Sequence, residues 1–364
     1  MTQKASVSRA ATITGHGQAL PGVLSQQQLW DGYFKAHYRD HPLARTVWEK
    51  SGITTRRGVV DPTQEDISGW GTGARMRRFV EEAMPLGREA VGKALADAGL
   101  DPAEVGLFAV ASCTGYATPG LDIMLARDVG MGDSTQRLHI GHMGCYAALP
   151  GLGAVSDFVV ARQKPAVLLC LELTSLHVQP APPEEPSKAD LQQMVAHALF
   201  SDAAAAIVLE PGARAGLEVV DAVARTDVST ADHMTWDVTD LGFVMGLSPK
   251  VPDVLGVHVG PVVEELLSRN GLTAADVQGW AVHPGGRRIV EVVAERLGLS
   301  DAQTEHSFAV LDEIGNCSSA TVLLVLERVA AALPPSTGSD RQEWVVAMAF
   351  GPGLTLCASL LRRT

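Results

Sequence analysis

The chain has 364 residues, of which 46% are hydrophobic and only 19% are charged, so it can bury a large core. This composition excludes a disordered or fibrous protein. The formal net charge of −12 argues against a nucleic-acid partner, because neutralising phosphates requires clustered lysine and arginine.

Runs of apolar and β-branched residues bounded by turn residues predict buried strands along the chain. The predicted strands are residues 105–112, 166–171, 203–209, 279–283 and 343–350. Helical patterns separate them, and this alternation is typical of an α/β fold with buried sheets. Residues 179–188 include four prolines and are predicted to form an exposed loop.

An internal repeat gives the strongest indication of architecture. Residues 94–112 and 266–284 align without a gap, and both read as a helix, Gly-Leu, an acidic turn and a buried strand. The same offset places Gly144-Cys145 on Asn316-Cys317, each followed by small residues that begin a predicted helix. We therefore predict two duplicated halves, residues 1–212 and 213–364, that pack as pseudo-twofold mates. Chance similarity of helix–turn–strand units remains the alternative.

The five cysteines are odd in number and widely spaced, which is unlike a secreted disulfide framework. They are Cys113, Cys145, Cys170, Cys317 and Cys357. A reducing compartment fits this pattern better. Because no run of about 18 uncharged apolar residues is present, we expect a cytoplasmic protein without membrane insertion.

Cys145 follows a glycine and precedes small residues at the start of a predicted helix. Unpaired backbone N–H groups and the helix dipole stabilise a thiolate at such a position, and the thiolate is the form that attacks carbonyl carbons. A buried, unreactive cysteine is the alternative on local sequence alone.

The internal repeat indicates two further candidate site residues, His283 and Asn316. His283 directly follows a predicted strand, at the kind of strand end where ligand and catalytic groups collect in α/β sheets. Asn316 lies in the turn that corresponds to the turn of Cys145. If the halves pack as pseudo-twofold mates, these turns converge, and Cys, His and Asn form a set of nucleophile, base and dipole. A core histidine and an ordinary helix cap remain the alternatives.

His139, His142 and Cys145 also lie at spacings of three, as metal ligands can. This pattern is weak, because no fourth ligand and no CxxC or HExxH motif accompanies it. We expect no metal site. The chain also has no GxxxxGK[ST], GxGxxG or GxSxG motif, so phosphate-loop, dinucleotide-binding and serine-elbow chemistries lack support.

At these residues the sequence resembles the thiolase superfamily and, within it, the type III polyketide synthases. Six segments carry the resemblance: Ser112-Cys-Thr-Gly with Thr118-Pro-Gly, Gly144-Cys145, Ala198-Leu-Phe-Ser-Asp202, His283-Pro-Gly-Gly286, Gly315-Asn316 with Ser318-Ser319, and Phe350-Gly-Pro-Gly353. The resemblance implies a thiolase-like, five-layered αβαβα fold of two duplicated halves that acts as a homodimer. The related 3-ketoacyl synthases III share the Cys, His and Asn, but the Gly-Pro-Gly ending is more like the polyketide synthases.

The resemblance also implies roles for individual residues. The family's nucleophile, histidine and asparagine fall on Cys145, His283 and Asn316. Its substrate-binding positions fall on Phe200, Met245, Lys50, Cys113, Thr118, His177, Ala196, Ser318 and Pro352. Among these, the resemblance makes Phe200 the gate of the coenzyme A tunnel, puts Met245 in place of a second phenylalanine, and gives Lys50 a contact with the coenzyme A phosphates.

Cys113, Thr118 and His177 depart from the plant pattern, which puts a plant-like flavonoid product in doubt. Residues 139–152 and 171–180 look most like actinobacterial and mycobacterial alkylpyrone synthases. Together with the small Ala196, this predicts room for an aliphatic starter.

The implied reaction loads an acyl-CoA starter on Cys145 and extends it with malonyl-CoA by decarboxylative Claisen condensation, releasing a cyclised pyrone or resorcinol-type product. Coenzyme A thioesters are substrates here, and no cofactor is implied. The sequence leaves open whether methylmalonyl-CoA is accepted. The alternatives are a single-condensation enzyme of the 3-ketoacyl synthase III type and a non-catalytic acyl-binding partner, although the latter has no reason to keep all three catalytic residues.

Overall fold

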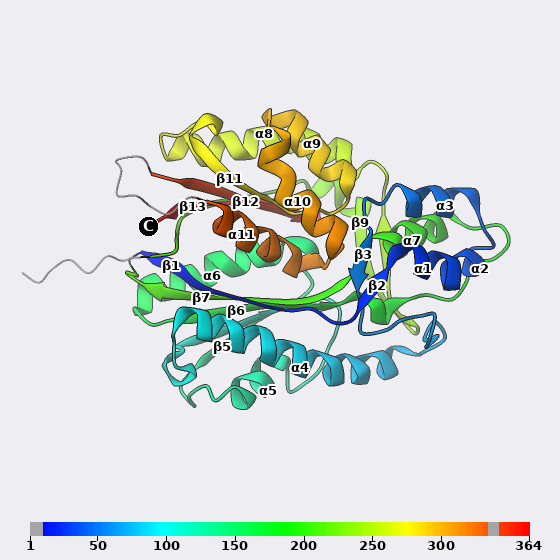
Figure 1. Ribbon diagram of the computed structural model, residues 1–364, viewed down its shortest axis with the longest axis horizontal. Helices are drawn as coiled ribbons and strands as arrows, with labels where there is room; N and C mark the ends of the chain where they lie inside the picture. The colour runs from blue at the N-terminus through cyan, green and yellow to red at the C-terminus, as the bar shows by residue number, and fades with distance from the viewer. Residues whose placement is uncertain (1–9, 214, 334–341) are drawn as a thin grey trace, which may run out of the picture.

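The computed structural model describes residues 10–213, 215–333 and 342–364 (Figure 1). Within these residues, nine strands form one continuous sheet in the order β11-β12-β13-β8-β1-β7-β6-β4-β5. The strands of the first half-sheet are β1 (Ala11–Ala19), β4 (Leu107–Ala111), β5 (Gln136–Ile140), β6 (Ala166–Leu173) and β7 (Asp202–Pro211). Those of the second are β8 (Leu217–Thr226), β11 (Val277–Val282), β12 (Trp344–Gly351) and β13 (Thr355–Arg363).

The two half-sheets repeat one pairing pattern. β4 runs parallel to β6, which pairs antiparallel with β7, which in turn pairs antiparallel with β1. In the same way β11 runs parallel to β12, followed by antiparallel β13 and β8. The half-sheets meet where residues 11–13 pair antiparallel with residues 217–219. The two half-sheets thus have the same strand order and directions, as expected for duplicated halves.

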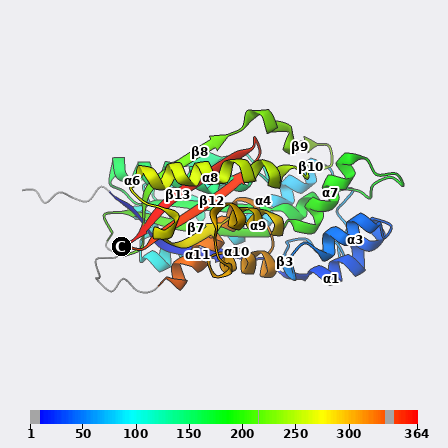
Figure 2. The same ribbon diagram turned by 90° about the horizontal axis from the view of Figure 1, so that it is seen from above.

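Five layers stack from bottom to top in Figure 1. Helices α4 (Thr72–Ala98) and α5 (Leu121–Asp128) cover the first half-sheet, and α8 (Val251–Arg269) and α9 (Arg287–Leu297) cover the second. Helices α6 (Ala148–Arg162) and α11 (Thr321–Ala332) lie between them, with α10 (Asp301–Glu313) packed against α9 and α11. Figure 2 shows α8 lying over β13. The predicted αβαβα arrangement is confirmed.

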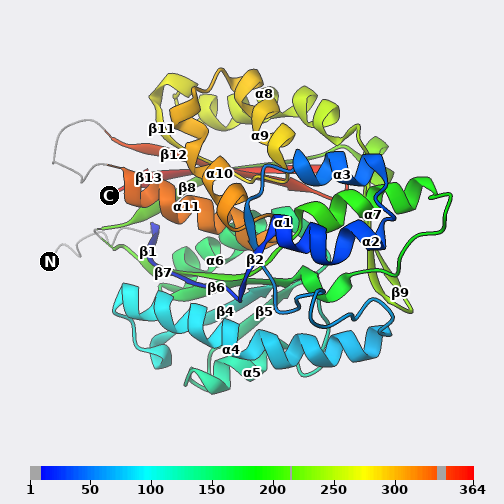
Figure 3. The same cartoon turned by 45° about the vertical axis from the view of Figure 1, so that its right-hand side comes forward.

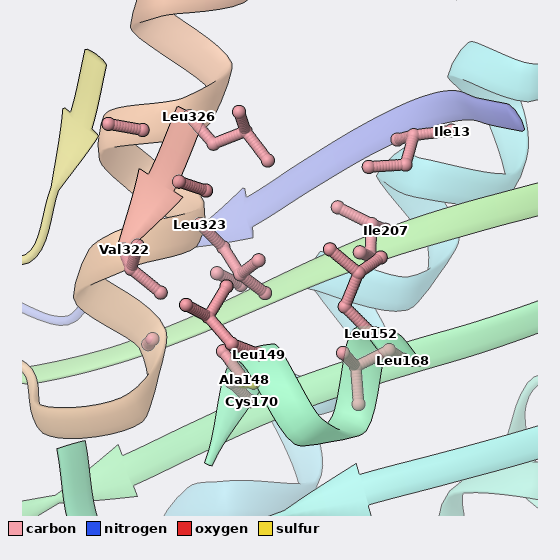
Figure 4. Packing of buried hydrophobic residues seen from close by; sticks show 14 of the residues in the cluster. Ile13, Ala148, Leu149, Leu152, Leu168, Cys170, Ile207, Val322, Leu323 and Leu326 are labelled. Atoms are coloured by element: carbon pink, nitrogen blue, oxygen red, sulfur yellow. The ribbon is translucent and has the colours of Figure 1, made fainter. Parts of the chain in front are cut away.

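The middle layer is an apolar core. Leu149 and Leu152 of α6 pack with Leu168 and Ile207 of the first half-sheet and with Leu323 of α11 (Figure 4). Each of these side chains is at most 2% exposed. By length and composition alone, the segment Gly144–Arg162 could cross a membrane, but half of it is buried in this core, as in the core helix of a globular protein.

All five predicted strands are present, as β4, β6, β7, β11 and β12. Strand β1 has no clear pattern in the sequence because Gly15 and Gly17 interrupt its alternation. A Cβ at either glycine would lie 2.2 Å from a backbone oxygen of α4, so the close approach of α4 excludes larger residues there. The predicted loop 179–188 ends one residue early, since Lys188 begins α7 (Lys188–Leu199) behind the Ser187 cap.

The remaining short elements gather at one end of the sheet, which comes forward in Figure 3. They are α1 (Gln26–Leu29), α2 (Lys35–His37), α3 (Pro42–Glu49), the paired strands β2 (Val23–Ser25) and β3 (Thr55–Arg57), and the hairpin β9 (Met234–Thr239) and β10 (Gly242–Leu247). Helix α7 packs between α3 and β10. This end of the molecule holds the walls of the site described next.

Candidate active site

A tight turn presents Cys145 at the start of α6. Gly144 adopts φ +70°, and a Cβ there would lie 2.8 Å from the Pro352 ring, so only glycine fits. Cys145 lies in the 3-10 turn Gly144–Tyr146 that leads into α6. Pro352 therefore supports the turn of Cys145 from the second half of the molecule.

The Cys145 thiol is buried, with 6% of the residue exposed. Burial raises the pKa of this thiol to about 12, and the nearby Glu172 charge acts in the same direction. A hydrogen bond with the Ser318 hydroxyl lowers the pKa but does not cancel these effects. Burial therefore opposes formation of the thiolate that the sequence pattern favours at this position.

His283 lies directly behind the last residue of β11. Its backbone N–H donates to Met348 O at 2.8 Å, and its ring meets Phe350 edge-on with centroids 5.5 Å apart. The residue is fully buried, and burial lowers the pKa of the imidazole to about 3. Neither ring nitrogen has a hydrogen-bond partner in the described protein. A neutral imidazole with two unsatisfied nitrogens is ready to exchange hydrogen bonds with a substrate.

The Asn316 side chain is fixed from both ends. Its Oδ1 accepts from the backbone N–H of Ser318 at 2.9 Å, and its Nδ2 donates to Gly285 O at 3.2 Å. This orientation turns the amide nitrogen toward the turn that follows His283. The second Nδ2 hydrogen remains available to an acceptor in the site.

One cavity of about 590 Å³ brings these residues together. Cys145, His283 and Asn316 all line it, together with Phe200, Met245 and Phe350. Helix α3 contributes Leu43, Val47 and Lys50, and α7 contributes Leu191, Val195 and Leu199. In each helix these residues are spaced three or four apart and so share one face. Two largely apolar helix faces, with Lys50 just beyond the end of α3, thus form a wall of the cavity that Cys145, His283 and Asn316 line.

The same cavity carries positive charge. Lys50, at the C-terminal end of α3, lines it, as do Arg287 and Arg288 at the start of α9. Arg287 and Arg288 are also paired with Glu291 of the same helix. In a chain with a net charge of −12, this local positive charge favours an anionic substrate.

His177 and Ala196 line a second, smaller cavity of about 50 Å³, which shares Phe200 with the first. His177 is locked in place: Nδ1 accepts from Phe243 N at 3.0 Å, Nε2 donates to Thr114 O at 2.7 Å, and the ring stacks on Phe243. Phe200 thus separates a large space from a small one.

The other predicted binding residues lie outside both cavities. Cys113 Sγ lies 3.7 Å from Ser318 Oγ, close to the nucleophile. Thr118 is exposed on the loop before α5, where its hydroxyl contacts Tyr116. Within this chain Thr118 does not reach the catalytic cavity, and its binding role stays a prediction.

Sequence reasoning missed Glu172 and Trp236. Glu172 is fully buried at the end of β6 and accepts a hydrogen bond from Cys113 N at 3.0 Å. A single charge in the apolar run 166–173 was the signal available for it. Trp236 lines the small cavity and donates to Cys113 O at 2.8 Å. No local sequence pattern marks Trp236.

The metal alternative finds no geometric support among the described residues, where no three His, Cys, Asp or Glu side chains gather as ligands. His139 and His142 are exposed, whereas Cys145 is buried. The three therefore do not share one environment.

Comparison with known proteins shows the family of the chain. The family models for the N-terminal and C-terminal domains of chalcone and stilbene synthases match residues 1–213 and 218–364. The alpha-pyrone synthesis polyketide synthase-like Pks18 of Mycobacterium tuberculosis is 34% identical over 326 residues, covering 85% of this chain and 79% of that protein. The 1,3,6,8-tetrahydroxynaphthalene synthase of Streptomyces peucetius is 33% identical over 330 residues, covering 89% and 84%.

Solved structures show the same fold. PKS-I from the brown alga Ectocarpus siliculosus matches with a TM-score of 0.88 and 28% identity, over 100% of both chains. The 1,3,6,8-tetrahydroxynaphthalene synthase of Streptomyces coelicolor matches with a TM-score of 0.88 and 26% identity, over 97% of this chain and 99% of that one. The chain thus belongs to the chalcone and stilbene synthase family, the type III polyketide synthases.

Proposed function

We propose that this chain condenses malonyl-CoA onto an acyl starter held as a thioester on Cys145, with His283 and Asn316 as the other catalytic residues. One observation carries the assignment: three side chains from three distant segments meet on one cavity that also has cations on its wall. A non-catalytic acyl-binding protein would not need a buried histidine with two unsatisfied nitrogens.

Loading of the starter begins with a neutral Cys145 thiol and a neutral His283 imidazole. His283 accepts the proton of the Cys145 thiol as the sulfur attacks the acyl-CoA carbonyl, and the imidazolium returns that proton to the departing coenzyme A thiolate. Burial disfavours both charged partners, so the proton transfer is coupled to the attack rather than completed before it. The start of α6 at Cys145 stabilises the negative charge that develops on the sulfur.

Extension depends on His283 and Asn316. When malonyl-CoA loses carbon dioxide, the electron pair of the broken C–C bond forms an enolate whose negative charge lies on the thioester oxygen. His283 N–H and the free Asn316 Nδ2–H donate to that oxygen. The enolate carbon then attacks the thioester carbonyl on Cys145 and the C–S bond breaks. The released Cys145 thiolate takes up one proton from solvent, because the thiol proton left with coenzyme A during priming.

The passage between α3 and α7 fits the pantetheine arm of coenzyme A. Its walls are apolar, and Lys50, Arg287 and Arg288 supply charges for the phosphates.

The names of two relatives support a cyclised product for this chain. The Mycobacterium tuberculosis relative is named for alpha-pyrone synthesis, and the Streptomyces peucetius relative is named for a tetrahydroxynaphthalene.

We also propose that the protein is a homodimer. Strand β5 is the last strand of the sheet, and four of its five residues are exposed. An exposed edge strand offers unpaired backbone groups to another chain. Tyr116, which is 68% exposed, and Leu138 add apolar area to this side. Sedimentation of the wild type and of Leu138→Asp tests this, and a monomeric wild-type protein would refute it.

All five cysteines are free, which fits a reducing compartment, and we propose a cytoplasmic location on that basis.

The proposed condensing activity is tested with radiolabelled malonyl-CoA and a panel of acyl-CoA starters, with products identified by mass. We expect cyclised products containing more than one malonyl-derived unit. Release of a single-condensation 3-ketoacyl product alone would favour the 3-ketoacyl synthase III type of reaction instead.

A further inference from the structure

Phe200 and Asn316 are joined by backbone hydrogen bonds, although they are far apart in the sequence. They form an isolated parallel bridge. Next to it, Ser201 N donates to Asn316 O at 2.9 Å and Asn316 N donates to Leu199 O at 3.1 Å. Any displacement of the chain at Phe200 therefore moves the backbone that carries the Asn316 amide.

Arg56 of β3 holds one side of this bridge. Its Nη1 donates to His197 O at 2.6 Å and to Phe200 O at 3.0 Å. Both carbonyls lie at the C-terminal end of α7, where a positive charge is favourable. The guanidinium also faces the Trp48 ring, with 4.7 Å to the ring centroid. The two carbonyls and the ring fix the position and the plane of the guanidinium.

The Cβ of Arg56 also lies close to the other side of the bridge. Gly315, just before Asn316, has φ +89°, and a Cβ there would lie 3.2 Å from Arg56 Cβ and 2.9 Å from Ser201 Cβ. Arg56 is only 6% exposed, and although burial lowers its pKa to about 10, it stays protonated at neutral pH. Arg56 thus lies beside both segments that the bridge joins: its guanidinium bonds the end of α7, and its Cβ lies close to Gly315.

We propose that Arg56 is a positioning residue that holds the Phe200 gate and the Asn316 amide in one fixed arrangement for condensation. The inference rests on the proposed function, because it takes Asn316 as a donor to the enolate. A lysine would keep the charge but not the plane that lets one Nη1 reach two carbonyls. Arg56→Lys should therefore disturb the step that needs Asn316 more than the step that needs only Cys145 and His283.

Arg75 offers a matched control. It is also fully buried and donates to backbone carbonyls, those of Trp70 at 2.8 Å and Ser68 at 2.9 Å, but it contacts neither side of the Phe200–Asn316 bridge. The experiment compares the wild type, Arg56→Lys and Arg75→Lys. It measures Cys145 acylation in a single turnover by mass, carbon dioxide release from malonyl-CoA, and the thermal midpoint.

For Arg56→Lys we expect acylation within about twofold of wild type and carbon dioxide release reduced about tenfold or more. Arg75→Lys should change the two rates by the same factor. Carbon dioxide release unchanged in Arg56→Lys, or both rates falling equally as in Arg75→Lys, would overturn the proposal.

Two further variants separate a failure of the Arg56 proposal from a failure of the proposed role of Asn316. Asn316→Ala tests the underlying function: if it retains carbon dioxide release, the role of Asn316 fails, whatever Arg56 does. If Arg56→Lys does not fold, Ser201→Ala replaces it. The Ser201 hydroxyl accepts from Arg57 N at 2.8 Å and donates to Ile314 O, two residues before Asn316, so it also joins the two segments. Ser201→Ala should show the same selective loss, and an equal loss of both steps contradicts the inference.

Discussion

Ser319 Oγ donates a hydrogen bond of 2.6 Å to the Glu172 carboxylate, and this contact joins the two halves of the molecule close to the nucleophile. Glu172 also accepts from Thr114 Oγ1 at 2.8 Å and from Cys113 N at 3.0 Å. It is fully buried, and burial raises the pKa of its carboxyl. Glu172 thus orders the groups around Cys145 and at the same time opposes ionisation of its thiol.

Glu172→Gln should make the Cys145 thiol more acidic, because it removes a negative charge that disfavours the thiolate. At a fixed pH of about 8, we expect iodoacetamide to alkylate Cys145 at least about threefold faster in the variant. Mass mapping of the modified peptide follows Cys145 separately from the other cysteines. A slower or unchanged rate would show that the charge of Glu172 does not control the thiol.

The alkylation rate of wild-type Cys145 should depend steeply on pH. Burial holds the pKa of the thiol near 12 and that of His283 near 3, so both groups are neutral throughout the range between. The thiolate fraction, and with it the alkylation rate, should rise about tenfold per pH unit from pH 7 to pH 10. A rate that is already constant below pH 7 would instead demonstrate a thiolate–imidazolium pair.

The sequence predicts which residues meet at the proposed site, but it does not predict their protonation. The Gly144-Cys145 turn and the strand end before His283 are local patterns, and the internal repeat predicts that the turns of Cys145 and Asn316 meet. The pKa of Cys145 depends instead on burial and on Glu172, which comes from another strand. Such effects depend on tertiary packing, which the local sequence does not encode.

Cys145 should be the only cysteine that becomes acylated by acyl-CoA. Cys170 and Cys317 are 0% exposed within the core, and Cys357 is 5% exposed in a strand. Cys113 is the nearest competitor, but burial and Glu172 raise the pKa of its thiol well above the usual value. Mass spectrometry of the acylated enzyme locates the adduct, with Cys113→Ser as the control that should still be acylated. An adduct on Cys113, or product formation by Cys145→Ala, would refute the assignment.

Asn316→Ala should separate decarboxylation from priming. Loss of one donor to the enolate should reduce carbon dioxide release from malonyl-CoA by about 10²–10³ while Cys145 is still acylated. His283→Ala should lose both steps, because the imidazole also takes the thiol proton. Asn316→Asp is the matched control: it keeps the shape but removes the N–H donor, so it should behave as Asn316→Ala does. Normal decarboxylation in either Asn316 variant would contradict the role.

The volume available to the growing chain determines which starter lengths we expect the enzyme to accept. In the proposed reaction the pantetheine arm of malonyl-CoA occupies the passage between α3 and α7, so we expect the chain on Cys145 to extend past Phe200. The smaller cavity that Phe200 also lines has a volume of only about 50 Å³, and His177, Ala196 and Trp236 are among its lining residues. A water molecule needs roughly 10–15 Å³ of such space, so this cavity has room for only a few atoms. It is smaller than the aliphatic tunnel suggested by Ala196 and by the likeness to alkylpyrone synthases.

We therefore expect short starters to be preferred, with turnover falling beyond about six carbons in a series from acetyl-CoA to palmitoyl-CoA, because chain atoms that find no cavity gain no burial energy. Ala196→Phe fills the small cavity further and should lower hexanoyl-CoA use while leaving acetyl-CoA use intact, because Cys145 remains reachable from the large cavity. Trp236→Ala removes one wall and should shift the preference toward longer starters. In an enlarged cavity each added methylene contributes about 0.8 kcal/mol, or about fourfold in affinity, until the space is full. Wild-type turnover that rises through palmitoyl-CoA would mean that Phe200 and Trp236 move aside for the chain.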